Sequence, residues 1–161
     1  MHSSIDPPMS SDTQITQIKV FLMDEYQPEL QGLAKLIQAE YPRMHLVGTA
    51  TTRSATLTGV IRQKPDVVML DYGLGNVCTL KFLSQLAVLG HYRILMLIGQ
   101  QYSSELGRRV LALGACGVIN KEAPAELLLY AIECAYKQGS WCELFTQKKL
   151  VIERRNFSRQ H

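Results

Sequence analysis

VVMLDYGLGN (residues 67–76) places four apolar residues directly before a single carboxylate, Asp71, and follows that carboxylate with two glycines. A short apolar run of this kind is typical of a strand that is buried on both faces of a parallel sheet. Four more runs of similar character occur along the chain, at residues 19–23, 44–50, 94–98 and 116–119. The segment therefore predicts one strand of a five-stranded sheet, with Asp71 at the carboxyl end of that strand.

Apolar residues with helical spacing fill the intervals between these runs. Leu30, Leu33 and Ile37 follow the first run, and Leu106 and Val110 follow the fourth. Strands that alternate with helices indicate a parallel sheet with helices on both faces. The right-handed crossover rule leaves few topologies, and five strands favour the flavodoxin-like order 2-1-3-4-5. The predicted fold class is therefore α/β.

Charged residues follow three of the predicted strands. Asp24 and Glu25 follow the first, Asp71 ends the third, and Lys121 follows the fifth. Ligands of open parallel sheets bind beyond the carboxyl ends of the strands, so we expect these side chains to converge there. Taken singly, each acid could cap a helix and the lysine could simply be solvated. Because all four occur at matching ends of three strands, a shared functional site is favoured over these separate roles.

The chemistry of such a cluster is restrictive. Three carboxylates within a few ångströms cannot all stay ionised unless a cation lies among them, and hard oxygen ligands suit Mg²⁺. With Mg²⁺ and Lys121 neutralising charge, Asp71 can act as a nucleophile toward a phosphoryl group. Gly73 and Gly75 would let the backbone after Asp71 approach the metal or the phosphate closely.

Bulk properties set further limits. The apolar runs are far shorter than a bilayer span requires, and the polar start of the chain does not read as a secretory signal, so a cytoplasmic location without membrane contact is expected. The formal charge excess of +3 lies within residues 143–161. This segment is either a basic arm for nucleic acid or an acidic partner, or a solvated helical extension.

Three segments together resemble a known family: KVFLMDEYQPEL (residues 19–30), PDVVMLDYGLG (65–75) and GACGVINKEAPAEL (114–127). They resemble the receiver domain of two-component response regulators, in the branch that usually carries a LuxR/NarL-type DNA-binding domain. The resemblance implies that Asp71 is the phosphoacceptor and that a sensor histidine kinase is the phosphodonor. It also implies that Mg²⁺ is bound by the Asp24, Glu25 and Asp71 carboxylates and the main chain of Gly73, while Lys121 contacts the phosphoryl group.

The sequence departs from the family at the residues that report phosphorylation. A Thr or Ser usually ends the fourth strand, but the corresponding residue here is Gly99 or Ile98, depending on loop length. The family has an aromatic residue three positions before the lysine, where this chain has Val118. Tyr102, Ser103 and Ser104 carry hydroxyl groups in the following loop, and any of them could substitute.

The expected organisation is an N-terminal extension (1–16), a receiver domain (17–141) and a basic tail or short helix (142–161). The last segment is too short for a helix-turn-helix, so DNA binding by this chain is not expected unless an output domain is missing. Three functions remain open. The first is a phosphorylatable, non-enzymatic receiver that acts by protein contact, possibly as a homodimer; the others are a phosphorylation-independent pseudo-receiver and an enzyme or flavin carrier on the same fold.

Overall fold

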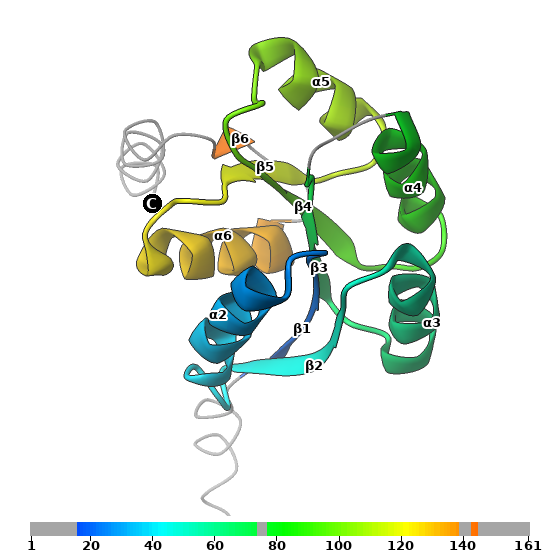
Figure 1. Ribbon diagram of the computed structural model, residues 1–161. Helices are drawn as coiled ribbons and strands as arrows, with labels where there is room; N and C mark the ends of the chain where they lie inside the picture. Colours follow the sequence, from blue (N-terminus) through cyan, green and yellow to red (C-terminus); the bar gives the residue numbers. More distant parts are fainter. Residues whose placement is uncertain (1–15, 74–76, 139–142, 145–161) are drawn as a thin grey trace, which may run out of the picture.

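The computed structural model describes residues 16–73, 77–138 and 143–144, in which strands and helices alternate along the chain (Figure 1). The strands are β1 (Ile18–Met23), β2 (Met44–Ala50), β3 (Val67–Asp71), β4 (Arg93–Ile98), β5 (Gly117–Asn120) and β6 (Glu143–Leu144). The helices are α2 (Gln27–Gln38), α3 (Arg53–Gln63), α4 (Val77–Ala87), α5 (Ser104–Ala112) and α6 (Ala125–Gln138). None of the described helices is long and apolar enough to span a bilayer.

The strands form one parallel sheet in the order β2-β1-β3-β4-β5-β6. The first five strands confirm the predicted flavodoxin-like order. The sequence did not predict β6, which pairs with β5 and lies within the segment expected to be a basic tail or short helix. Residues 1–15 and 145–161, which hold nearly all of the two predicted extensions, lie outside the described residues.

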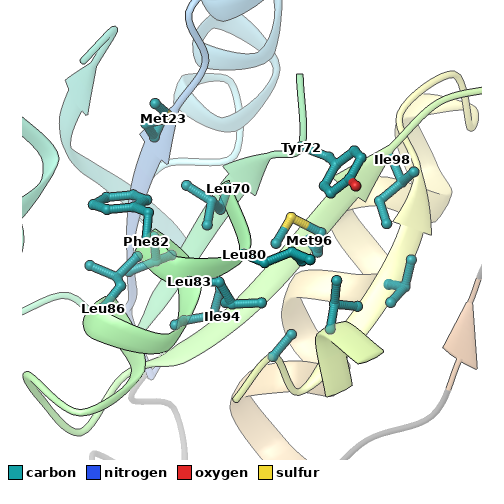
Figure 2. Packing of buried hydrophobic residues seen from close by; sticks show 14 of the residues in the cluster. Met23, Leu70, Tyr72, Leu80, Phe82, Leu83, Leu86, Ile94, Met96 and Ile98 are labelled. Carbon is teal, nitrogen blue, oxygen red and sulfur yellow. The ribbon is translucent and has the colours of Figure 1, made fainter. Parts of the chain in front are cut away.

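Alternate strand residues enter two separate cores, one on each face of the sheet. One core lies under α2 and α6, and β1 contributes Val20 and Leu22 to it. The other lies under α3, α4 and α5, and β1 contributes Phe21 and Met23 to it. Figure 1 shows the two groups of helices on opposite faces, and Figure 2 shows the second core from close by. Each core shields one face of the sheet from water, as a parallel sheet requires.

The ring of Phe21 occupies the space into which a side chain at either of two glycine positions would extend. A Cβ added at Gly48 on β2 would lie 2.7 Å from the Phe21 ring, and one added at Gly59 on α3 would lie 2.4 Å from it. Both separations are too short for real carbon atoms, so neither position accepts alanine unless the ring moves. One aromatic side chain therefore sets the approach of β1, β2 and α3 to one another.

Candidate functional site

Asp24, Asp71 and Lys121 emerge on the same face of the sheet. Each follows by two positions a strand residue of the α2–α6 core, so the alternation of the strand directs each side chain toward that face. Lys121 Nζ donates a hydrogen bond to Asp71 Oδ1 at 2.6 Å, and the Asp71 side chain is only 5% exposed. A largely buried ion pair thus joins the carboxyl ends of β3 and β5, where these side chains were expected to converge.

Asp24 is the most deeply buried acid of the site. It is 1% exposed, and its Oδ1 oxygen accepts a hydrogen bond from the Tyr26 backbone N–H at 2.9 Å. Its Oδ2 oxygen is buried and has no hydrogen bond of normal geometry. A buried carboxylate oxygen without a partner is unfavourable unless a proton or a cation reaches it.

Glu29, which was not among the site residues predicted from the sequence, also belongs to the cluster. Carboxylate oxygens of Asp24, Glu29 and Asp71 lie within 4.8 Å of one another. Lys121 Nζ also donates to Glu29 Oε1, at 2.9 Å. Glu29 lies in the first turn of α2, and helical side chains point back toward the helix N-terminus. That rule, applied to the helix that begins just after Asp24, was the available signal for Glu29.

Glu25 and Gly73 lie at the outer side of the same site. Glu25 is exposed, and its Oε1 oxygen is 4.0 Å from the position that a Cβ on Gly73 would occupy; Asp71 Oδ2 is 3.6 Å from that position. Gly73 has φ = 65°, a left-handed conformation that glycine adopts without steric cost. The Gly73 carbonyl also accepts a hydrogen bond from Gln101 Nε2 at 2.7 Å. Gly75 lies outside the described residues.

Burial and pairing shift the pKa values of the cluster in opposite directions. Burial, followed by the hydrogen bond to Glu29 and the charge of Asp71, raises the pKa of Asp24 to about 8. Burial also raises the pKa of Asp71, although Lys121 opposes this. For Glu29, burial is outweighed by hydrogen bonds from Asp24 and Lys121, so its pKa falls. Burial likewise opposes the charge of Lys121, but its two carboxylate partners raise its pKa. At neutral pH the cluster thus holds a proton on Asp24, which a metal ion could displace.

The altered switch positions lie on different faces of the sheet. Ile98 is fully buried in the α3–α5 core, together with Val118 of the neighbouring strand. Figure 2 shows Ile98 in this core with Met96 and Tyr72. Gly99 lies on the other face, where an added Cβ would be 3.3 Å from Lys121 Cδ. Neither alternative places a hydroxyl at the end of β4.

The nearby hydroxyl of Ser103 already has a structural role. Ser103 is the N-cap of α5, and its Oγ oxygen accepts a hydrogen bond from the Leu106 backbone N–H at 3.1 Å. N-capping of this kind stabilises a helix by about 1 kcal/mol. If the Ser103 hydroxyl took over the role of the missing β4 hydroxyl, it would have to give up this cap.

A parallel sheet of this order, with carboxylates and a lysine at its carboxyl edge, is a flavodoxin-like α/β fold with a charged site beyond the ends of its strands. The family model of the response regulator receiver domain matches residues 20–133, and the chain belongs to this family. Receiver domains are signalling modules of two-component systems and are generally not enzymes. The expected resemblance is thereby confirmed.

Individual relatives agree with the family. The chain is 26% identical over 141 residues to the oxygen regulatory protein NreC of Staphylococcus aureus, covering 84% of this chain and 63% of the relative. The receiver domain of NarL from Mycobacterium tuberculosis has a TM-score of 0.66 at 19% identity and covers 75% of this chain and 97% of that chain. The apo receiver domain of RcsB from Salmonella enterica has a TM-score of 0.68 at 17% identity, over 83% and 98% respectively. The chain thus spans less than two thirds of its curated relative.

Proposed function

We propose that the protein is a response regulator receiver that accepts a phosphoryl group on Asp71 from a sensor histidine kinase and signals through protein contact. The ion pair between Asp71 Oδ1 and Lys121 Nζ carries this proposal. It places a fixed cation beside the carboxylate on which negative charge accumulates during phosphoryl transfer.

The transfer itself requires few protein groups. An Asp71 carboxylate oxygen attacks the phosphorus of a phosphohistidine, a P–O bond forms as the P–N bond breaks, and the released imidazole nitrogen takes up a proton. Lys121, already within hydrogen-bond distance of Oδ1, neutralises part of the charge on the transferred group. The left-handed turn at Gly73 lets the backbone pass beside Asp71 Oδ2 without a side chain in the way.

The acidic cluster fits a Mg²⁺ ion. The donors are carboxylate oxygens, the class that Mg²⁺ prefers, and Asp24 Oδ2, which has no hydrogen bond of normal geometry, would gain a cation partner. We propose that Asp24, Asp71, Glu25 and the main chain of Gly73 would hold the ion, with Glu29 as a further carboxylate in reach. When bound, Mg²⁺ neutralises charge on the phosphoryl oxygens.

Intact-mass measurement after incubation with acetyl phosphate and Mg²⁺ tests the proposal. The wild-type protein should gain the mass of one phosphoryl group, and Asp71→Asn should gain none. Asp66→Asn is a matched control, because Asp66 precedes the same strand but lies at its other end, bonded to the Lys19 backbone N–H. The control should be phosphorylated like the wild type. If the wild type stays unmodified under conditions that modify an ordinary receiver, the proposal is wrong.

A phosphorylation-independent pseudo-receiver is the second candidate. It is favoured by Gly99 and Ile98, neither of which supplies the hydroxyl that usually ends β4, and by Val118, which lies in the α3–α5 core where the family has an aromatic ring. A ligand shifts a conformational equilibrium only through contacts that differ between the two states. Without those two groups, the usual contacts between the phosphoryl group and the surface of α5, β5 and α6 are missing.

A further inference from the structure

A pocket of about 490 Å³ lies at the amino edge of the sheet, the edge opposite Asp71. It is formed by the end of α3 and by the loops that precede β3 and β4; Pro65, His91 and Tyr92 belong to those loops. Because β3 is five residues long, roughly 15 Å of strand separates the pocket from Asp71. The pocket is therefore distinct from the phosphorylation site.

The walls of this pocket are held by hydrogen bonds. Tyr92 Oη donates to the Leu86 carbonyl at 2.6 Å, which fixes the aromatic ring against the end of α4. Asp66 joins three strands, because its backbone N–H donates to the Lys19 carbonyl at 2.8 Å and its carbonyl accepts from the Arg93 N–H at 2.9 Å. Its carboxylate also accepts from the Lys19 N–H at 2.8 Å. A pocket built on such a frame is preformed, which lowers the entropic cost of binding.

Large apolar side chains are exposed around the opening. Ile61 of α3 is 59% exposed and Leu89 of the α4–β4 loop is 44% exposed, and both line the pocket. Val88, next to Leu89, is 82% exposed. Apolar side chains gathered at the rim of a pocket are typical of protein interaction sites, where an apolar anchor of the partner enters the pocket.

Basic side chains predominate around the pocket. Lys64 and His91 line it, and the single carboxylate of the lining, Asp66, is engaged by the Lys19 backbone. Neither α3 nor α4 contains an Asp or Glu, whereas Arg62 and Lys81 are exposed on these two helices. Figure 1 shows α3 and α4 on the same face of the sheet. This face would repel basic partners and attract acidic ones.

We propose that this pocket docks an acidic segment of a partner protein that inserts one large apolar side chain beside Ile61 and Leu89 and places carboxylates near Lys64. The apolar pocket supplies burial for the anchor, and the basic rim supplies the charge preference. Docking here does not require a phosphoryl group on Asp71, so this role goes beyond the function proposed above. It gives the domain a second contact surface at the far edge of the sheet.

Selection from a random-peptide phage library on the immobilised full chain tests this proposal. Enriched peptides should carry a Leu, Phe or Trp flanked by Asp or Glu. Their affinity, measured by fluorescence polarisation, should fall at least about tenfold with Ile61→Asp and about threefold or more with Lys64→Glu. Lys35→Glu, an exposed charge reversal on α2, is the matched control and should leave the affinity unchanged. Amide spectra of each variant verify that it is folded.

Exchanging the charges of the peptide and the protein distinguishes specific docking from non-specific binding. Peptides in which Lys replaces the acids should bind wild type poorly and regain affinity for Lys64→Glu. The proposal is overturned if the selected peptides are neutral or basic, if no peptide is enriched, or if both pocket variants bind as wild type does. Dimerisation that Ile61→Asp abolishes would also overturn it, because the occupant would then be a second copy of this chain.

Discussion

Replacing Asp24 by asparagine should make the protein more stable, by an amount that grows with pH. Asp24 is 1% exposed, its Oδ2 oxygen has no hydrogen bond of normal geometry, and Asp71 and Glu29 lie close by. Asparagine has nearly the same shape, keeps an oxygen for the Tyr26 N–H, and carries no charge. The substitution therefore removes the charge penalty and keeps the packing.

The magnitude follows from the pKa of Asp24. Its value is raised from 3.8 to about 8, mainly by burial. In this range the unfolded chain releases the proton that the folded protein retains, so the stability of the wild type falls as pH rises from about 4 to about 8 and is level above that. A difference of this size converts, at ~1.4 kcal/mol per pH unit, to an upper limit of roughly 6 kcal/mol. Because Asp71 and Glu29 share the penalty, we expect a gain of roughly 2 kcal/mol for Asp24→Asn.

Urea denaturation with EDTA, at about pH 5, 7 and 9, measures this difference. The gain in the free energy of unfolding should be small at the lowest pH and largest at the highest. Asp66→Asn, the matched control, should instead lose about 1 kcal/mol, because it weakens the hydrogen bond from the Lys19 N–H. A wild type that is more stable than Asp24→Asn at pH 9, or a gain that does not increase with pH, would refute the reasoning.

Three further predictions concern the core, the metal and the switch. Gly59→Ala should reduce the free energy of unfolding by about 1–3 kcal/mol, because the added methyl group meets the Phe21 ring; Gly32→Ala, with nothing within 4 Å, should raise it by up to about 1 kcal/mol, and equal effects would contradict this. Glu29→Gln should weaken Mg²⁺ binding severalfold in a calorimetric titration, because it removes one of three clustered carboxylates. The control Glu105→Gln, at an exposed glutamate in the first turn of α5, should leave Mg²⁺ binding unchanged. Beryllofluoride should leave hydrogen exchange from α5 to α6 almost unchanged, since both altered switch residues lack the usual groups; strong new protection there would show another route of switching.

The fold could be predicted from the sequence because its signal is local. Each of the first five strands is an apolar run, and the predicted bounds differ from the observed ones by one residue at most. The sixth strand was not predicted because Glu143–Leu144 is too short to show an alternation of apolar and polar residues. It is recognisable only from its pairing with β5 at the edge of the sheet.

The residues of the site were predicted in part. Those that were missed or left open depend on the direction in which a side chain points, which the composition of a segment does not give. Asp24, Asp71 and Lys121 could be placed because strand ends of a parallel sheet converge. Glu29 joins them from the first turn of α2, so it could be found only by adding the direction of helical side chains to the rule for strand ends. The choice between Ile98 and Gly99 likewise needs the register of the sheet. Ile98 pairs with Asn120 and is buried with Val118, while Gly99 lies toward the lysine.

The shared space around the Phe21 ring has a genetic consequence. Positions 21, 48 and 59 lie far apart in the sequence but share one volume, so the effect of a substitution at one of them depends on the residues at the others. A smaller residue such as leucine at position 21 should suppress the defects of alanine at either glycine, although it would be harmful alone. Among relatives of this chain, we expect a bulky aromatic at the first position to be inherited together with glycine at the other two.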